Sequence, residues 1–138
     1  MSDLSDKLID NLETACSAWD GEFEDNTCSV GDHQIKVEKN SEKVISKIEI
    51  TPKLQISNEG KRRVAKDGSV RWEKSVNKDD HIIMTNFRDG KLEFGIMDTD
   101  NKEKSSSNLV EFTIRRSGDD IEVCNTYNIG QWRSCVIL

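Results

Sequence analysis

The segment HIIMTNFRDGKLEFGI (residues 81–96) sets an Asp-Gly pair between two stretches in which apolar and polar residues alternate. Asp89 and Gly90 both tolerate a positive φ, which the two-residue turn of a β-hairpin requires. A hairpin closed there predicts the opposite pairs Phe87 and Leu92, Thr85 and Phe94, and Ile83 and Ile96. Apolar residues therefore meet mostly apolar residues, as they do in an antiparallel sheet with one buried face.

Three further turn sequences predict hairpins on the same grounds, namely Asp67-Gly68, Ser117-Gly118 and Ile129-Gly130. They predict the opposite pairs Ala65 and Val70, Arg63 and Trp72, Ile114 and Ile121, Phe112 and Val123, Arg115 and Asp120, Tyr127 and Trp132, Val123 and Val136, and Cys124 and Cys135. Roughly eight to ten strands in sequential hairpins form an up-and-down meander. In a domain this small, such a meander closes into a barrel or bends strongly.

The N-terminal residues follow a helical period instead. An apolar stripe recurs every three or four residues and consists of Leu4, Leu8, Leu12, Ala15, Cys16 and Trp19. Ser2 is suited to be the N-cap of this helix, and Gly21 is suited to end it. We therefore expect one mainly β domain over residues 1–138, with a helix at 3–18 and an antiparallel meander at 20–138.

Charge is unevenly distributed along the chain, whose formal net charge is −6. Residues 1–32 hold nine acidic residues and one basic residue, Lys7. An acidic N-terminal region argues against nucleic acid as a partner, because phosphates require a basic surface. The acidic residues indicate either a solvated surface or a patch that meets a basic protein partner.

The sequence shows neither the pattern of a signal peptide nor an apolar run long enough to span a membrane. We therefore expect a cytoplasmic protein without membrane contact. The four cysteines, Cys16, Cys28, Cys124 and Cys135, form no Cys-x-x-Cys pair and are expected to be buried thiols in a reducing cytosol. A disulfide between Cys124 and Cys135 is the alternative, because the predicted register sets them opposite each other.

The sequence contains no recognisable motif of catalysis or metal binding. Its two histidines, His33 and His81, each follow an acidic residue, and this context predicts solvated turn positions. The chain lacks a Gly-x-Ser-x-Gly elbow, a glycine-rich phosphate loop and a local Cys-His metal pattern. These features favour a non-enzymatic protein that requires no metal and no cofactor.

The size, the meander and the leading helix together resemble the calycins, the superfamily of lipocalins and fatty-acid-binding barrels. Lipocalins have a tryptophan at the barrel entry that packs on an arginine of the final strand, and Trp19 and Arg133 are similar in position. Residues 67–73 (DGSVRWE) and residues 126–128 (TYN) followed by Trp132 resemble motifs of the S-type phycobiliprotein lyases, which handle bilins. In those lyases acids flank the tyrosine where this chain has threonine and asparagine. The resemblance implies that the protein handles a chromophore, and bilin lyase-like transfer is the enzymatic alternative.

The large aromatic side chains and nearby arginines are the candidates to line a pocket. The candidate ligand-binding residues are Trp19, Arg63, Trp72, Tyr127, Trp132 and Arg133. They predict a non-catalytic, ligand-binding or chaperone-like barrel for a small apolar ligand, and the resemblance adds a linear tetrapyrrole. The other interpretation is a small acidic protein–protein interaction module, such as an inhibitor, immunity or accessory protein.

Overall fold

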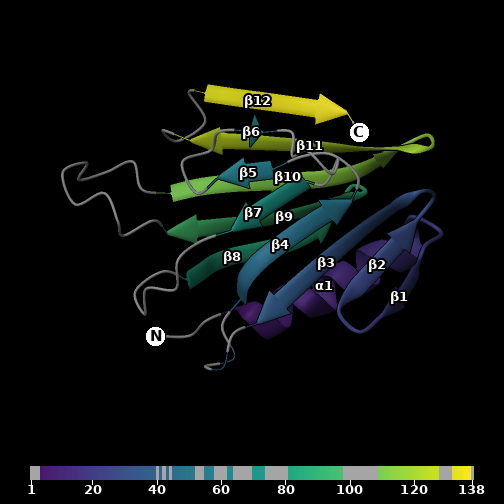
Figure 1. The fold of residues 1–138 in the computed structure, drawn as a ribbon, viewed down its shortest axis with the longest axis horizontal. Helices are drawn as coiled ribbons and strands as arrows, with labels where there is room; N and C mark the ends of the chain where they lie inside the picture. The colour runs from purple at the N-terminus through teal and green to yellow at the C-terminus, as the bar shows by residue number, and fades with distance from the viewer. Residues whose placement is uncertain are drawn as a thin grey trace.

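The computed structural model describes residues 4–39, 41, 43, 45–51, 55–57, 62–63, 70–73, 81–97, 109–127 and 132–137. These residues form one helix and twelve strands, which Figure 1 shows in chain order. The elements are α1 (Ser5–Ala18), β1 (Glu22–Glu24), β2 (Thr27–Val30), β3 (His33–Lys39), β4 (Ile45–Thr51), β5 (Gln55–Ser57), β6 (Arg62–Arg63), β7 (Val70–Glu73), β8 (His81–Arg88), β9 (Lys91–Met97), β10 (Leu109–Ser117), β11 (Asp120–Tyr127) and β12 (Trp132–Ile137).

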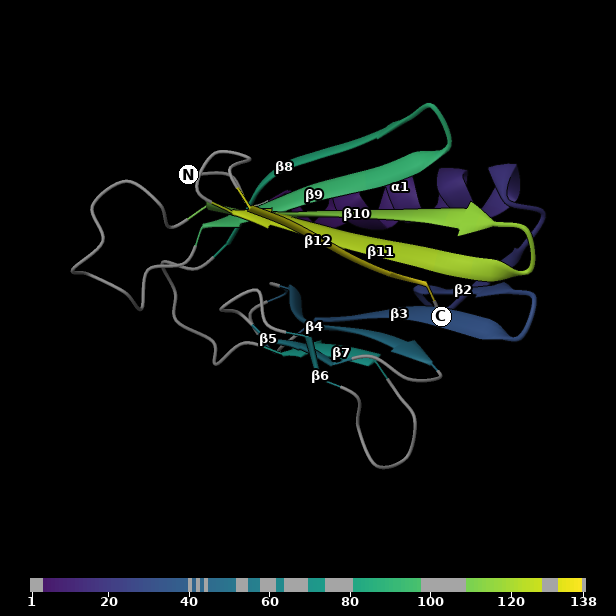
Figure 2. The same cartoon turned by 90° about the horizontal axis from the view of Figure 1, so that it is seen from above.

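The strands are divided between two sheets, which Figure 2 shows as two layers. One sheet has the order β1-β2-β3-β4-β7-β5-β6, and the other has the order β12-β11-β10-β9-β8. All neighbouring strands are antiparallel except β5 and β7, which run parallel. The predicted mainly β, largely antiparallel fold with one N-terminal helix is confirmed. The predicted continuous meander is wrong in the seven-stranded sheet, because β7 lies between β4 and β5 and runs parallel to β5. No ladder joins the two sheets among the described strands, so closure into a barrel stays a prediction.

The core lies between the two sheets and α1. The helix contacts β8 and β9 of the five-stranded sheet and β1 and β2 of the seven-stranded sheet. Its predicted apolar stripe is buried from Leu8 onward, with Leu4 partly buried, and Asn11 donates a hydrogen bond to Thr85 of β8 (Nδ2–Oγ1 3.0 Å). Inward residues of both sheets join the same cluster, among them Val30, Ile35, Val37, Ile48, Ile50, Leu92, Phe94, Phe112, Ile114, Ile121 and Val123. Burying each large aliphatic side chain contributes about 1.5–3 kcal/mol.

The N-terminal end of α1 differs from the prediction. The helix begins at Ser5 with Leu4 as its N-cap, so the predicted N-cap Ser2 is wrong. Among the described residues no side chain caps this end, and the hydroxyl of Ser5 instead accepts a hydrogen bond from the N–H of Ile45 (3.2 Å). That bond ties the first helical turn to the start of β4.

The C-terminal end of α1 is a Schellman motif. The N–H of Gly21 donates to the carbonyl of Cys16 (2.8 Å), and the N–H of Asp20 donates to the carbonyl of Ser17 (3.2 Å). Asp20 has a φ of 61°, so the left-handed residue that ends the helix is Asp20, one position before the predicted Gly21. Aspartate tolerates this conformation better than most residues, but its Cβ still carries a steric cost.

Replacing Asp20 with glycine is therefore expected to raise the free energy of unfolding by about 0.5–1 kcal/mol, because glycine adopts a positive φ without that cost. Urea denaturation measures the change. Asp32→Gly is the control. Asp32 is an exposed turn residue whose φ is not positive, so glycine there only adds freedom to the unfolded chain and should lower stability slightly. An Asp20→Gly protein no more stable than the parent would contradict the explanation.

Two of the predicted registers are largely correct. The turn at Asp89-Gly90 pairs β8 with β9 and sets Phe87 opposite Leu92 and Thr85 opposite Phe94, as predicted. A bulge between Ile82 and Met84 then makes Ile82, instead of Ile83, the partner of Ile96. All three pairs predicted between β11 and β12 are confirmed, namely Tyr127 and Trp132, Val123 and Val136, and Cys124 and Cys135.

Two other registers were wrong. The turn between β10 and β11 is at Gly118-Asp119, so Ile114 pairs with Val123 in place of Ile121. The shift is two residues, which leaves every side chain on its predicted face because the strand period is two. The same shift pairs Arg115 with Glu122 and Phe112 with Asn125.

The predicted pairing of Arg63 with Trp72 is also wrong. Strand β7 lies between β4 and β5, where Trp72 is opposite Ile48 and Ile56, and Arg63 of β6 is opposite Gln55. The Asp67-Gly68 turn itself lies outside the described residues. A long-range pairing with β4 therefore replaces the local hairpin that the turn sequence suggested.

Candidate functional site

All four cysteines form disulfides, so the prediction of free thiols is wrong. Cys16 of α1 is joined to Cys28 of β2, with 5.7 Å between their Cα atoms. Cys124 of β11 is joined to Cys135 of β12, with 4.1 Å between their Cα atoms. The second bond follows from the predicted register, whereas the first joins a helix to a strand and has no local sequence signal.

Trp19 is the one candidate ligand-binding residue whose side chain lies within the described part of the chain. It is 6% exposed, its indole N–H donates to the carbonyl of Gly90 (2.9 Å), and its ring meets the ring of Phe87 edge-on at 6.3 Å. Its own carbonyl accepts a hydrogen bond from Arg116 of β10. Trp19 thus fixes the end of α1 to the β8–β9 turn, and its indole N–H is already hydrogen-bonded within the protein.

The other five candidates are placed by strand register alone, because their side chains lie outside the described part. Tyr127 and Trp132 face each other across β11 and β12, and Arg133 is the next residue of β12. These residues are at the end of the five-stranded sheet opposite the Gly118-Asp119 turn. Trp19 lies at the turn end, beside Gly90, so the structure does not bring it together with them.

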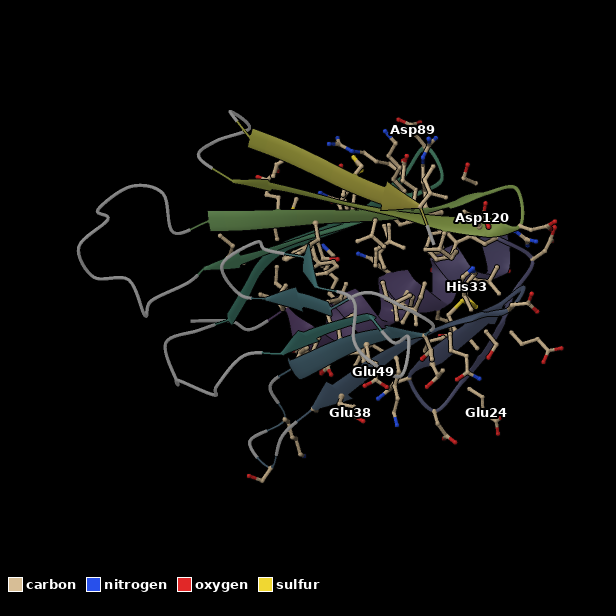
Figure 3. The ribbon with its side chains drawn as sticks, turned by 45° about the horizontal axis from the view of Figure 1, so that its top comes forward. Glu24, His33, Glu38, Glu49, Asp89 and Asp120 are labelled. Carbon is tan, nitrogen blue, oxygen red and sulfur yellow. A yellow bond between two sulfur atoms is a disulfide. The ribbon has the colours of Figure 1, made fainter. Side chains whose placement is uncertain are left out.

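His33 is buried, so its predicted solvated turn position is wrong. It is the first residue of β3 and 7% exposed, and it lies between the two sheets in Figure 3. Its Nδ1 atom has no hydrogen-bond partner among the described residues. His81 begins β8, and its side chain lies outside the described residues. Within the described residues no three His, Cys, Asp or Glu side chains gather as a metal ion would require.

Exposed acidic side chains are concentrated on α1 and on the β1–β2 hairpin, two elements that contact each other. We call this set the acidic surface, and it consists of Asp10, Glu13, Asp20, Glu22, Glu24 and Asp25. Glu24 extends away from the body of the protein in Figure 3. In residues 4–32 the only basic residue is Lys7, which is also exposed. The neighbouring Phe23 packs partly against the core and anchors β1 beneath these charges.

Asp6 is the acidic residue of α1 that is paired across the fold. The ammonium of Lys39 donates a hydrogen bond to Asp6 Oδ1, which joins the first helical turn to the end of β3. That hydrogen bond, the charge of Lys39 and the charge of Lys43 lower the pKa of Asp6 from its ordinary value. The ionised form of Asp6 is therefore favoured by folding.

The Asp6–Lys39 ion pair is expected to make the free energy of unfolding depend on pH in the acidic range. Because the folded pKa lies below the unfolded value of about 3.9, the contribution is present above that pH and is lost as the pH falls through the folded pKa. Asp6→Asn should be slightly less stable than the parent at neutral pH, and the difference should vanish in strong acid. Urea titrations across the acidic range test this, with Asp10→Asn as control. A difference that stays constant with pH would contradict the assignment. The effect is small because Asp6 is exposed.

The basic pair Arg115-Arg116 serves local contacts. Arg115 is paired with Glu122 (2.6 Å) on the outer face of the five-stranded sheet. Arg116 donates to the carbonyls of Trp19 and Gly118 and lies near Asp119. Both arginines therefore take part in local contacts, and the arginine that bonds to Trp19 belongs to β10 and not to the final strand.

No protein-family model, curated protein or solved structure matches this chain. Helix α1, the helix of the described residues, lacks the length and apolar character needed to cross a membrane. The features that bear on function are two packed sheets, a helix that contacts both of them, two disulfides and an exposed acidic surface.

Proposed function

We propose that the protein is a non-catalytic binding module that recognises a basic protein partner through the acidic surface. The observation that carries the proposal is the segregation of charge. Residues 4–32 hold eight exposed acids and a single lysine. In β8–β11, by contrast, acidic and basic side chains are interspersed, and Arg88 pairs with Glu93 and Arg115 with Glu122. Charges of one sign gathered on one surface steer an oppositely charged partner and select against partners of like charge.

The acidic surface is carried by elements that are fastened to one another. The Cys16–Cys28 disulfide joins α1 to β2, and β2 pairs with β1 along Glu22–Glu24. The Schellman motif and the Trp19–Gly90 hydrogen bond fix the segment between α1 and β1. A partner that meets such a surface has little chain to order on binding, which favours affinity.

The disulfides also bear on where this binding takes place. Disulfides form and persist in oxidising compartments and are rare in a reducing cytosol. Two of them, one with both cysteines fully buried, favour an extracytoplasmic or otherwise oxidising location over the cytoplasmic one expected from the sequence. Secreted and cell-surface partners are accordingly the first to test.

Two charge-neutralised variants of equal net charge test the proposed partner site. The first carries Asp10→Asn, Glu13→Gln, Glu22→Gln and Glu24→Gln on the acidic surface. The matched control carries Asp89→Asn, Glu111→Gln, Asp119→Asn and Asp120→Asn, all at exposed positions elsewhere. Both variants and the parent are immobilised, and captured proteins from the source organism are quantified by mass spectrometry at low and high salt.

We expect a basic partner that the parent and the control retain, that the first variant loses, and that high salt releases. Equal capture by both variants would refute the acidic surface as the site. Capture of acidic partners alone would refute the electrostatic argument. Unfolding curves of both variants verify that neither has lost the fold.

A small apolar ligand is the second candidate, favoured by the register that sets Tyr127 opposite Trp132 next to Val110 of β10. This places aromatic residues on adjacent strands, at the end of the sheet away from Trp19. Native mass spectrometry of protein isolated from its source would show a ligand as added mass, and mixing with a linear tetrapyrrole would shift the pigment's visible absorption. An unmodified mass together with an unshifted spectrum would refute this candidate.

A further inference from the structure

The two disulfides lie in opposite environments. Cys16 and Cys28 are completely buried, each with 0% of its surface exposed. Cys124 is 3% exposed, but its partner Cys135 is an exposed residue of β12. An external thiol can therefore approach the second disulfide from the side of Cys135, whereas both cysteines of the first are shielded while the protein is folded.

The accessible disulfide lies on the outer face of the five-stranded sheet. Along β11 the buried Ile121 and Val123 alternate with residues of the other face, including Cys124. Its partner strand β12 ends the strand order of the sheet and lies along the upper edge in Figure 1. Ile137 comes two residues after Cys135 and so lies on the same face. It is 58% exposed, and among the described residues no other large hydrophobic side chain is exposed.

We propose that the Cys124–Cys135 disulfide is a thiol-exchange site whose reaction partner is a dithiol oxidoreductase. Exposed disulfides are the labile ones in exchange, and the attacking group must reach a sulfur along the S–S axis from outside. Only Cys135 offers that approach, so it is the sulfur attacked. Ile137 supplies an apolar contact beside it for the incoming protein.

The reaction balances as a two-electron exchange. A thiolate of the oxidoreductase attacks Cys135 Sγ, the bond to Cys124 breaks, and Cys124 leaves as a thiolate that takes up a proton. The second thiol of the oxidoreductase then attacks the mixed disulfide and releases Cys135 as a thiol. The oxidoreductase ends as a disulfide, and this chain ends with two thiols.

Reduction changes how the edge of the sheet is held. In the oxidised protein β12 is attached to β11 by the ladder and by the covalent bond. In the reduced protein only the ladder remains, so the C-terminal strand opens more often, which exposes the edge of β11. The Cys16–Cys28 bond and the core around it are unaffected.

Differential alkylation of the full, folded chain tests the site. The protein is incubated with reduced thioredoxin or with dithiothreitol, quenched with N-ethylmaleimide at successive times, and mapped by peptide mass spectrometry. We expect Cys124 and Cys135 to be labelled at least about tenfold faster than Cys16 and Cys28, because access to sulfur controls the rate. Hydrogen exchange on the reduced protein should rise in β12 before it rises in α1.

Equal rates for the two disulfides, or faster reduction of Cys16–Cys28, would overturn the proposal, as would complete resistance of both to thioredoxin. Ile137→Ser tests the apolar contact of Ile137 separately from the accessibility of the disulfide. This variant should react more slowly with thioredoxin and at an unchanged rate with dithiothreitol. An unchanged rate with thioredoxin would overturn the role of Ile137.

Discussion

Replacing Cys16 and Cys28 with alanine is expected to lower the free energy of unfolding by about 4 kcal/mol. Losing a native disulfide typically costs about 2–5 kcal/mol, largely because the unfolded chain regains conformational freedom. Here a second cost is added, because both cysteines are fully buried in the core cluster. Alanine leaves space where the two sulfur atoms had been packed, and a closed core relaxes only partly around such a space.

The second disulfide is the matched control. Cys124 and Cys135 are 11 residues apart and Cys16 and Cys28 are 12 apart, so the two bonds close loops of nearly equal length. The conformational entropy that the unfolded chain regains is therefore nearly the same in both cases. Replacing Cys124 and Cys135 with alanine should cost only about 2–3 kcal/mol. Urea denaturation of both double variants measures the difference. An equal cost for the two would show that burial of the Cys16–Cys28 bond adds nothing to stability.

Much of the fold was predictable because its signals are local. The period of three to four residues gives the buried face of α1, and the Asp89-Gly90 turn gives most of the β8–β9 register. The features that were missed are non-local. Strand β7 pairs with β4 and β5, far from it in sequence, and the bulge between Ile82 and Met84 leaves no mark in the apolar–polar alternation. A two-residue slip at Gly118 also leaves the alternation intact, so no pattern distinguishes the two registers.

The candidate site was less predictable, and one missed signal was present in the sequence. His33 stands two residues before Ile35, which is two before Val37, so alternation alone places it on the buried face. Its acidic neighbour Asp32 suggested a solvated turn instead, and that local context was the weaker evidence. The Cys124–Cys135 bond was implied by register as well, but the compartment inferred from the N-terminus favoured thiols. The sequence suggested a ligand-binding role for Trp19, which stays a prediction, and only its three-dimensional contacts show that it fastens the helix.

Replacing Gly21 with alanine is expected to cost about 2–3 kcal/mol, the second large effect. A Cβ atom at this position would lie 2.7 Å from the backbone carbonyl oxygen of Ser29 and 2.9 Å from Cys16 Sγ. Real Cβ atoms do not come this close to other atoms, so one side must move. The neighbour on one side is the backbone of β2, and on the other it is a disulfide sulfur with 0% exposure, so neither yields at low cost.

Gly90→Ala and Gly118→Ala are the controls that separate crowding from backbone strain. Both glycines have a positive φ, of 74° and 64°, and an added Cβ would meet no atom of the described residues within 4 Å. Each control should therefore cost only about 1 kcal/mol, from the left-handed backbone alone. If Gly21→Ala costs more than either control, the close approach of α1 and β2 at the disulfide is tight enough to admit only glycine. If it costs less, the helix end shifts to accept a methyl group, and the rigid support proposed for the acidic surface would have to be abandoned.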